Sequence, residues 1–259
     1  MAPLELLALA ASAAAAGLVN AIAGGGTLLT FPALLLTGIS PIAANATSTV
    51  ALLFGIVGSL FGYRRQIAAV RPWLSRFVPV SLAGGLLGGV LLTMGGEKLF
   101  SWLVPFLILF ATLLFMAQGV FRSFAGLAPA EGGGSPHPRA RALAAAVGFQ
   151  FLVAVYGGYF GAGAGILMLA SLGFLGLGNI HEMNGLKTVL GAVINLTAAI
   201  YFIASGLIDW PKAGVMTIGA VAGYYLGSHW SQRIPQAFVR RGIIGVGFAI
   251  TVVLFWRRA

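Results

Sequence analysis

Charged residues are absent from long stretches of the chain, and these stretches indicate its architecture. No Asp, Glu, Lys or Arg occurs in residues 6–63 or 142–181, and each run exceeds the roughly 20 residues that one helical crossing of a bilayer needs. Shorter charge-free runs cover residues 77–96, 99–121, 188–208, 213–232 and 242–256. The runs are continuously apolar, without the alternation typical of a membrane β-barrel. They predict an all-α polytopic membrane protein with about eight transmembrane helices.

The amino-acid composition narrows the class of protein further. Hydrophobic residues make up 59% of the 259 residues and charged residues 8%, whereas charged residues are about a quarter of an average soluble domain. A soluble globule could not bury so much apolar surface, which excludes a soluble enzyme, a nucleic-acid-binding domain and a disordered chain. The net charge of +10 comes from arginines between the apolar runs, where the positive-inside rule places them, so no nucleic-acid partner is expected.

The sequence gives no reason to expect a cofactor, a metal site or a catalytic centre. The chain has no cysteine, no His and carboxylate residues at metal-ligand spacing, and no P-loop for an ATP-driven pump. No basic segment precedes the first apolar run, so a cleaved secretory signal is not expected. We therefore expect a multi-pass protein of the cell inner membrane that has the lipid bilayer as a partner and is not an enzyme.

A polar segment near the middle divides the chain into two halves. Residues 122–138 contain three prolines, a glutamate and three successive glycines, a composition typical of a flexible loop. We expect residues 1–121 to form a first transmembrane repeat, residues 122–138 a cytoplasmic loop, and residues 139–259 a second transmembrane repeat.

The two halves resemble each other when the sequence is shifted by 139 positions, because residues 15–88 then align without a gap. The informative matches are glycines, prolines and polar residues in one register: Gly24 with Gly163, Gly26 with Gly165, Asn45 with Asn184, Thr49 with Thr188, Pro72 with Pro211, Gly84 with Gly223 and Gly88 with Gly227. Internal duplication is common among secondary transporters. The alternative is chance similarity between two glycine-rich membrane helices.

Each half contains a glycine-rich interruption inside its longest apolar run. Three glycines at residues 24–26 precede Pro32 in the first half, and Gly163 and Gly165 lie at the matching place in the second. Three glycines cost about 3 kcal/mol of helix propensity relative to alanine. We therefore expect each half to contain a helix, an unwound segment near the membrane centre and a short helix, an arrangement that indicates a transport site. The alternative is that the glycines serve close helix packing.

A polar cluster follows each interruption, and Lys187 is its most informative member. Lys187 aligns with Ser48 and stands inside an apolar helix, where an ionisable group indicates a functional site. None of the five acidic residues lies deep in a run, and Glu182, the nearest, lies on another face of the helix. A substrate anion is therefore the expected partner of Lys187, unless its amine snorkels to the membrane interface. The expected substrate-binding residues are Gly24, Gly25, Gly26, Asn45, Ser48, Thr49, Gly163, Gly165, Asn184, Lys187 and Thr188.

These motifs resemble the TauE/SafE family of membrane permeases, also called the sulfite exporter family. The resemblance rests on GGGTLLTFPALL with ANATST in the first half and on GGYFGAGAGIL with NGLKTVL in the second, and it covers nearly the whole chain. It implies eight or so helices with internal duplication, and the export or import of sulfur-containing anions such as sulfite, thiosulfate or organosulfonates. One departure is Ser171, which stands where the first half has Pro32, so the two interruptions can differ in shape.

The expected function is that of a secondary transporter for small sulfur-containing anions, with its site between the two interrupted helices. An anion channel, or a structural membrane protein, is the alternative, and a homodimer is left open. The positive-inside rule places the central arginine-rich loop in the cytoplasm whether each half crosses four times or contains a re-entrant hairpin. We favour hairpins and inverted repeats, because they bring both interruptions to the midplane.

Overall fold

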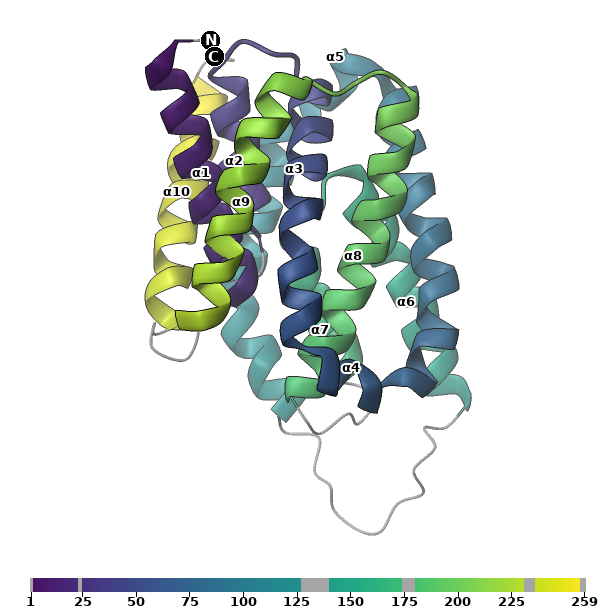
Figure 1. Cartoon of the computed structure of the whole chain (residues 1–259). Coiled ribbons are helices and arrows are strands. Elements are labelled where there is room, and N and C mark those ends of the chain that lie inside the picture. Colours follow the sequence, from purple (N-terminus) through teal and green to yellow (C-terminus); the bar gives the residue numbers. More distant parts are fainter. Residues whose placement is uncertain (1, 23–24, 127–139, 174–179, 231–235, 257–259) are drawn as a thin grey trace.

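The computed structural model describes residues 2–22, 25–126, 140–173, 180–230 and 236–256, and it confirms the predicted all-α architecture (Figure 1). No strand occurs in these ranges. The ten helices that they contain are α1 (Pro3–Ile22), α2 (Thr27–Leu35), α3 (Pro41–Gly62), α4 (Arg64–Ala69), α5 (Arg71–Gly126), α6 (Ala140–Tyr159), α7 (Ala164–Gly173), α8 (Ile180–Ala204), α9 (Trp210–Trp230) and α10 (Gln236–Trp256).

The helices fall into long and short ones. α5 consists of two helices, residues 71–95 and 97–126, joined at Gly96, which has a φ of 71°. The long helices have at least 20 residues and reach about 30 Å, the thickness of a bilayer core. α2 has 9 residues and α7 has 10, so each reaches only about half of that thickness. Pro3–Ala21, Arg71–Ala117 and Glu182–Ala204 are each long and apolar enough to cross a membrane.

Helices α1 and α2 form a hairpin that enters from one end of the molecule, and α6 and α7 form one that enters from the other. Figure 1 shows the start of α1 and the connection from α2 to α3 at the end where both termini lie, which we call the upper end. α6 starts and α7 finishes at the opposite, lower end, near α4. The two short helices therefore point toward opposite ends.

Hydrogen bonds between distant segments agree with this arrangement. The N–H of Ile42, at the start of α3, donates a 3.0 Å bond to Glu97, at the start of the second helix of α5. The N–H of Asp209, just before α9, donates a 3.1 Å bond to Oγ1 of Thr47 in α3. These three helices therefore begin together at the upper end.

The starts of corresponding helices recur at the 139-residue shift. α3 begins at residue 41 and α8 at residue 180, a difference of 139, and α5 and α9 begin at residues 71 and 210, the same difference. The second helix of α5 begins at residue 97 and α10 at residue 236, again 139 apart. α5 itself continues to Gly126, so residues 122–126 of the expected loop are helical.

The first helix of each half packs against a long helix of the other half, so that α1 lies along α9 and α6 lies along the first helix of α5. A methyl group at Gly223 would collide with the carbonyl oxygen of Ala14, and one at Gly84 would lie 2.8 Å from the carbonyl oxygen of Phe151. Glycine at these positions lets the backbones approach closely, as is common in membrane helix pairs. This packing between the halves brings the two helix interruptions together.

Candidate substrate site

The first interruption, which we call the first break, lies between α1 and α2. Gly25 has a φ of 97°, a left-handed conformation that glycine adopts without the steric penalty of a Cβ atom. The N–H of Gly26 donates a 2.7 Å hydrogen bond to Oδ1 of Asn20, so a side chain of α1 satisfies a donor that the helix has released. The predicted break is confirmed here, and Gly24 lies outside the described residues.

The second break, between α6 and α7, lies slightly earlier than the sequence predicted. Gly161 and Gly163 both have a φ of 77°, whereas Gly165 is helical and belongs to α7. The hydroxyl of Tyr156 donates a 2.6 Å hydrogen bond to the carbonyl oxygen of Ala162 and so satisfies an acceptor inside the break. A break is thus confirmed, but the expectation that Gly165 is unwound was wrong. Gly161 turns the chain at the end of α6, which leaves room for the helix to resume before Gly165.

A cavity of about 110 Å³ lies between the two breaks and is walled by α3, α8 and α9. A water molecule occupies about 30 Å³ of the liquid and a drug-sized ligand needs a pocket of about 300 Å³ or more, so the cavity suits an ion of a few atoms. Glycines of both breaks belong to the wall, and its polar residues are Asn20, Thr27, Thr49, Ser59, Tyr63, Lys187, Thr188, Asn195 and Tyr224.

Lys187 gives this wall a positive charge. Its aliphatic stem passes over Gly165, where a Cβ atom would lie 3.4 Å from Cδ of Lys187. No Asp or Glu belongs to the lining within the described ranges. The N-terminal ends of α2 and α7 also reach the cavity, since Thr27 and Gly165 line it, and helix N-termini carry partial positive charge. The cavity therefore combines a cation with several hydrogen-bond donors.

Aromatic side chains close the cavity on its upper side. Phe160 lines the cavity, and its ring packs edge-on against Phe31 and Phe100, with centroids 5.4 and 6.3 Å away. Both of these phenylalanines are completely buried. Beside them the hydroxyls of Thr30 and Ser48 form a buried 2.6 Å hydrogen bond. We call Phe31, Phe100 and Phe160 the aromatic roof.

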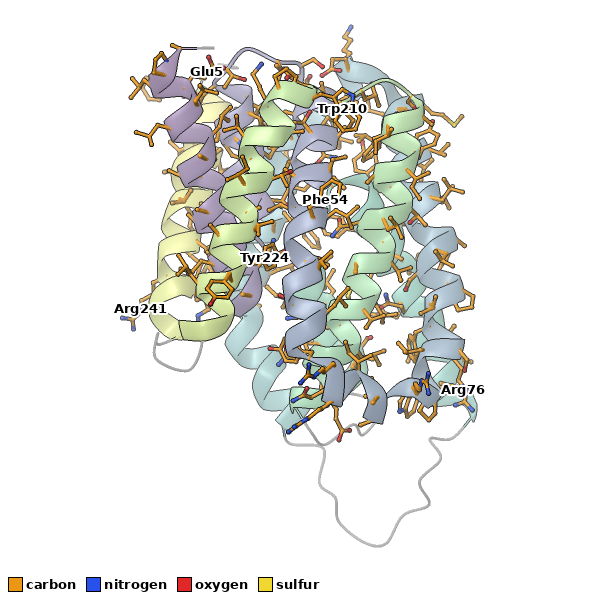
Figure 2. The ribbon with its side chains drawn as sticks, in the orientation of Figure 1. Glu5, Phe54, Arg76, Trp210, Tyr224 and Arg241 are labelled. Atoms are coloured by element: carbon orange, nitrogen blue, oxygen red, sulfur yellow. The ribbon has the colours of Figure 1, made fainter. Side chains whose placement is uncertain are left out.

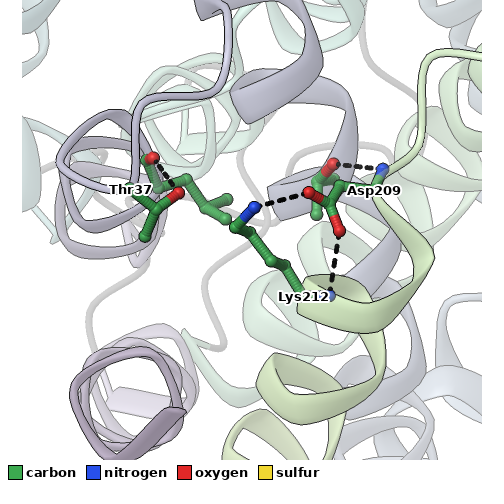
Figure 3. A network of polar contacts seen from close by, with 5 residues as sticks. Thr37, Asp209 and Lys212 are labelled. Carbon is green, nitrogen blue, oxygen red and sulfur yellow. Dashed lines mark hydrogen bonds and ion pairs between the residues drawn. The ribbon is translucent and has the colours of Figure 1, made fainter. Parts of the chain in front are cut away.

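Polar contacts tie helices together above the roof (Figure 3). Asp209 accepts a 3.2 Å hydrogen bond from the N–H of Lys212 and forms a 2.6 Å ion pair with its ammonium group. The N–H of Asp209 is bonded to Thr47, as described above. Thr37 lies nearby in this view and donates to the carbonyl oxygen of Leu34 at 2.7 Å. Of these contacts, the bond between Asp209 and Thr47 joins the start of α9 to α3 at the upper end.

The cavity extends toward the lower end, where positive charge gathers. Ser59 and Tyr63, at the end of α3, belong to its lining, and burial raises the pKa of Tyr63, so its hydroxyl stays protonated and can donate a hydrogen bond. Figure 2 shows Arg76 and Arg241 at this end and Glu5 at the other. The arginines of α4 and of the starts of α5 and α10 are Arg64, Arg65, Arg71, Arg76, Arg240 and Arg241.

The structure brings some of the predicted substrate-binding residues to the cavity wall, namely Gly25, Thr49, Gly165, Lys187 and Thr188. Asn45 and Ser48 do not line the cavity, because both are buried against neighbouring helices. Asn45 donates a 3.1 Å hydrogen bond to the carbonyl oxygen of Tyr159, and the hydroxyl of Ser48 is hydrogen-bonded to that of Thr30. The other described residues of the predicted set that lie outside the lining are Gly26, Gly163 and Asn184.

Six polar residues of the wall were not among the predicted substrate-binding residues: Asn20, Thr27, Ser59, Tyr63, Asn195 and Tyr224. Asn20 and Tyr224 come from α1 and α9, which belong to different halves, so no local spacing connects them. Tyr224 lies in the lower half of α9 (Figure 2). The one available signal was an asparagine inside an apolar run, six positions before Gly26. Asn195 lies two turns beyond Lys187 on the same helix, and the polar stripe that it continues along α8 is a sequence signal for a lined cavity.

A small polar cavity between two broken helices of a multi-pass membrane protein is the architecture of a membrane transporter. Comparisons with known proteins identify the family within this class. The chain belongs to the sulfite exporter TauE/SafE family, whose model matches residues 9–254.

Several relatives are similar over nearly their full lengths. A probable membrane transporter protein of Haemophilus influenzae is 28% identical over 243 residues, which cover 93% of this chain and 91% of the relative. The probable membrane transporter protein ORF9 of a Sinorhizobium species is 27% identical, covering 92% and 88%. The probable membrane transporter protein YfcA of Escherichia coli K12 is 27% identical, covering 98% and 91%. No solved structure matches the chain significantly.

Proposed function

We propose that this transporter is a secondary permease that carries small sulfur-containing anions, such as sulfite, thiosulfate or organosulfonates, through the cavity between its two breaks. The observation that carries the proposal is the position of Lys187, a cationic residue in the wall of a small cavity that hydroxyl and amide side chains also line. The description of the family as sulfite exporters supports sulfur-containing anions as the substrate class.

The lining favours an oxyanion over a cation or an apolar solute. The ammonium group of Lys187 attracts negative charge, and the hydroxyls of Thr27, Thr49 and Thr188 can donate hydrogen bonds. An oxyanion presents several acceptor oxygens and can engage these groups together, whereas a cation would be repelled by the lysine. The starts of α2 and α7 add backbone dipoles of the same sign, as at many anion sites on helix N-termini.

The orientation of the protein follows from its charges. By the positive-inside rule, the arginines at the lower end support a cytoplasmic location for that end, and we propose that the membrane is the cell inner membrane. The cavity then faces the cytoplasm, and the aromatic roof separates it from the outside. Two inverted repeats, of residues 1–121 and 139–259, would open the cavity to either side by rocking against each other.

The experiment that tests this proposal uses the purified chain in liposomes and in detergent. We expect saturable uptake of at least one of sulfite, thiosulfate, sulfate, taurine and sulfoacetate, and the same anion should raise the thermal unfolding midpoint. Lys187→Met keeps the side-chain length and removes the charge, so it should abolish uptake. Lys187→Arg should recover part of it, because the guanidinium is bulkier and donates in a fixed plane. Lys98→Met, at an exposed position of the upper end, is the control and should transport like the parent.

Three results would contradict parts of the proposal. Parent-like uptake by Lys187→Met would move the anion site away from this cavity. Uptake that rises linearly with concentration and shows no competition would indicate a channel. The absence of any stabilisation or uptake with all five anions would remove the substrate class.

A further inference from the structure

Asn20 connects the first break to a tyrosine of the other half. Its Oδ1 accepts the 2.7 Å hydrogen bond from the N–H of Gly26. Because a backbone N–H can only donate, this contact requires the amide oxygen on the side of the break and the amide NH2 group on the other side. The side chain of Asn20 is also hydrogen-bonded to that of Tyr224. The NH2 group of Asn20 therefore donates to the hydroxyl oxygen of Tyr224.

The direction of this bond determines what the hydroxyl of Tyr224 can still do. A phenolic oxygen that accepts a hydrogen bond from an amide keeps its own proton for another acceptor. Both Asn20 and Tyr224 line the cavity, and the rest of Tyr224 is buried, with only 3% of the residue exposed. The proton of this hydroxyl is therefore available to an acceptor inside the cavity.

Packing holds the ring of Tyr224 in this place. A Cβ atom at Gly55 of α3 would collide with the ring, so the missing side chain of Gly55 makes the space that the ring occupies. At the 139-residue shift Tyr224 corresponds to Gly85, so the first half offers no hydroxyl at the matching position. The cavity thus receives one donor from α9 and a cation, Lys187, from α8.

We propose that Tyr224 is a specificity-determining residue whose hydroxyl donates a hydrogen bond to the transported anion, and that Asn20 is the positioning residue that turns this proton toward the cavity. The inference rests on the proposed function and deepens it. An oxyanion can accept from the hydroxyl and from the cation at separate oxygen atoms, through short charge-assisted hydrogen bonds. A halide can also accept from both groups, but its charge is spread over a larger atom and its hydrogen bonds are weaker. The pair therefore favours a polyatomic oxyanion over a monatomic anion.

The test compares sulfite with bromide on the full chain in liposomes. Tyr224→Phe should raise the KM for sulfite about tenfold, the typical effect of losing a hydrogen bond to a charged group, while inhibition by bromide weakens by a smaller factor. Tyr201→Phe is the matched control, since it removes a hydroxyl that bonds Thr93 at 2.8 Å and does not line the cavity. It should keep the parent KM for sulfite.

A second variant tests the positioning role of Asn20. In Asn20→Asp the carboxylate can still accept from Gly26, but it would also accept from Tyr224 and turn the hydroxyl proton away from the cavity. Under mildly acidic conditions, where sulfite is mainly the monoanion hydrogensulfite, the added negative charge weakens sulfite and bromide alike, so the loss of sulfite affinity beyond that of bromide reports the hydroxyl. This excess should vanish when Asn20→Asp is made together with Tyr224→Phe, because the two changes act through one group.

The outcomes separate this inference from the proposed function. A parent-like KM for sulfite in Tyr224→Phe overturns the inference, and so does an equal loss for sulfite and bromide that accompanies a lower unfolding midpoint. If Lys187→Met abolishes uptake while Tyr224→Phe has no effect, the proposed function stands and only the inference is lost. A parent that neither binds nor transports sulfite or thiosulfate removes both.

Discussion

Each of the two breaks leaves a backbone polar group without a partner inside a helix, and a different kind of side chain satisfies that group in each case. At the first break an amide oxygen, from Asn20, accepts from the N–H of Gly26. At the second break a hydroxyl, from Tyr156, donates to the carbonyl oxygen of Ala162. The two side chains are not counterparts, because the 139-residue shift places Tyr156 over Gly17, and Gly17 packs against α9. An unwound segment thus needs a polar side chain as a partner, and that side chain can be either the acceptor or the donor of the hydrogen bond.

The residues around the breaks differ even more than the breaks themselves. Lys187 lines the cavity, whereas its counterpart Ser48 is completely buried and bonded to Thr30. Phe160 forms part of the roof, and its counterpart in the first half is Ala21, which lines the cavity. The second half therefore contributes the charge, and at this pair of positions it also contributes the aromatic ring. The comparison indicates that the two halves have similar backbone arrangements but contribute different side chains to the cavity.

The largest expected effect comes from moving the charge to the other half. Ser48→Lys should prevent folding or lower the unfolding midpoint strongly, because it buries an ammonium group where no cavity receives it, at a cost of several kcal/mol. Thermal unfolding in detergent measures the effect. Ser75→Lys, at an exposed site near the lower end, is the control and should behave like the parent. A stable Ser48→Lys variant would show that the two positions are equivalent after all.

The next largest effect concerns the side chain that holds the second break. Tyr156→Phe leaves the buried carbonyl oxygen of Ala162 without its partner, which should cost about 1–3 kcal/mol of stability. Tyr201→Phe should cost less, since the hydroxyl of Thr93 keeps its 2.9 Å bond to the carbonyl oxygen of Val90. Unfolding midpoints of the two variants provide the comparison. Equal midpoints would mean that the Tyr156 contact does not hold the break.

A smaller effect tests where the second break lies. Gly163→Ala places a Cβ atom on a residue with a φ of 77° and should destabilise the fold by about 1–2 kcal/mol. Gly165→Ala lies within α7, and its Cβ atom would meet Lys187 at an ordinary 3.4 Å contact, so its unfolding midpoint should stay close to that of the parent. The reverse order of the two midpoints would place the break at Gly165, as the sequence alone suggested.

The smallest effect makes the first short helix resemble the second. α2 is helical through Pro32, whereas the matching Ser171 in α7 bonds the carbonyl oxygen of Met168 at 3.2 Å. Pro32→Ser restores a backbone donor and adds a hydroxyl that can bond in the same way, so stability should change by less than about 1 kcal/mol. The unfolding midpoint and the KM for sulfite check this. A large loss in either would show that the proline shapes the first break.

The sequence predicted the helices and the breaks because both follow from local rules. Long apolar runs must be helical in a bilayer, and glycines adopt conformations that end a helix. Lys187 was found for a similar reason, since a charge inside an apolar helix is rare. Local rules failed where the answer depended on packing. The spacing of Asn45 and Ser48 places them on a helix, but it does not say which neighbour covers them, and both proved to be buried outside the cavity.

Tyr224 is the opposite case: it lines the cavity, but local rules did not predict it, because its position depends on packing. It lines the cavity because α9 of the second half lies between α1 and α3 of the first, a contact between residues more than 150 positions apart in the chain. No periodicity within α9 distinguishes it from the exposed Tyr225 beside it. Tyr224 reaches the cavity only because α9 packs against helices of the first half.

The most direct test of the central claim, that the cavity between the two breaks is the anion site, is an experimental structure of the protein with thiosulfate bound. The account predicts density for one anion in the cavity, in contact with the ammonium group of Lys187 and the hydroxyl of Tyr224. An anion bound elsewhere in the molecule, with this cavity holding only water, would contradict it.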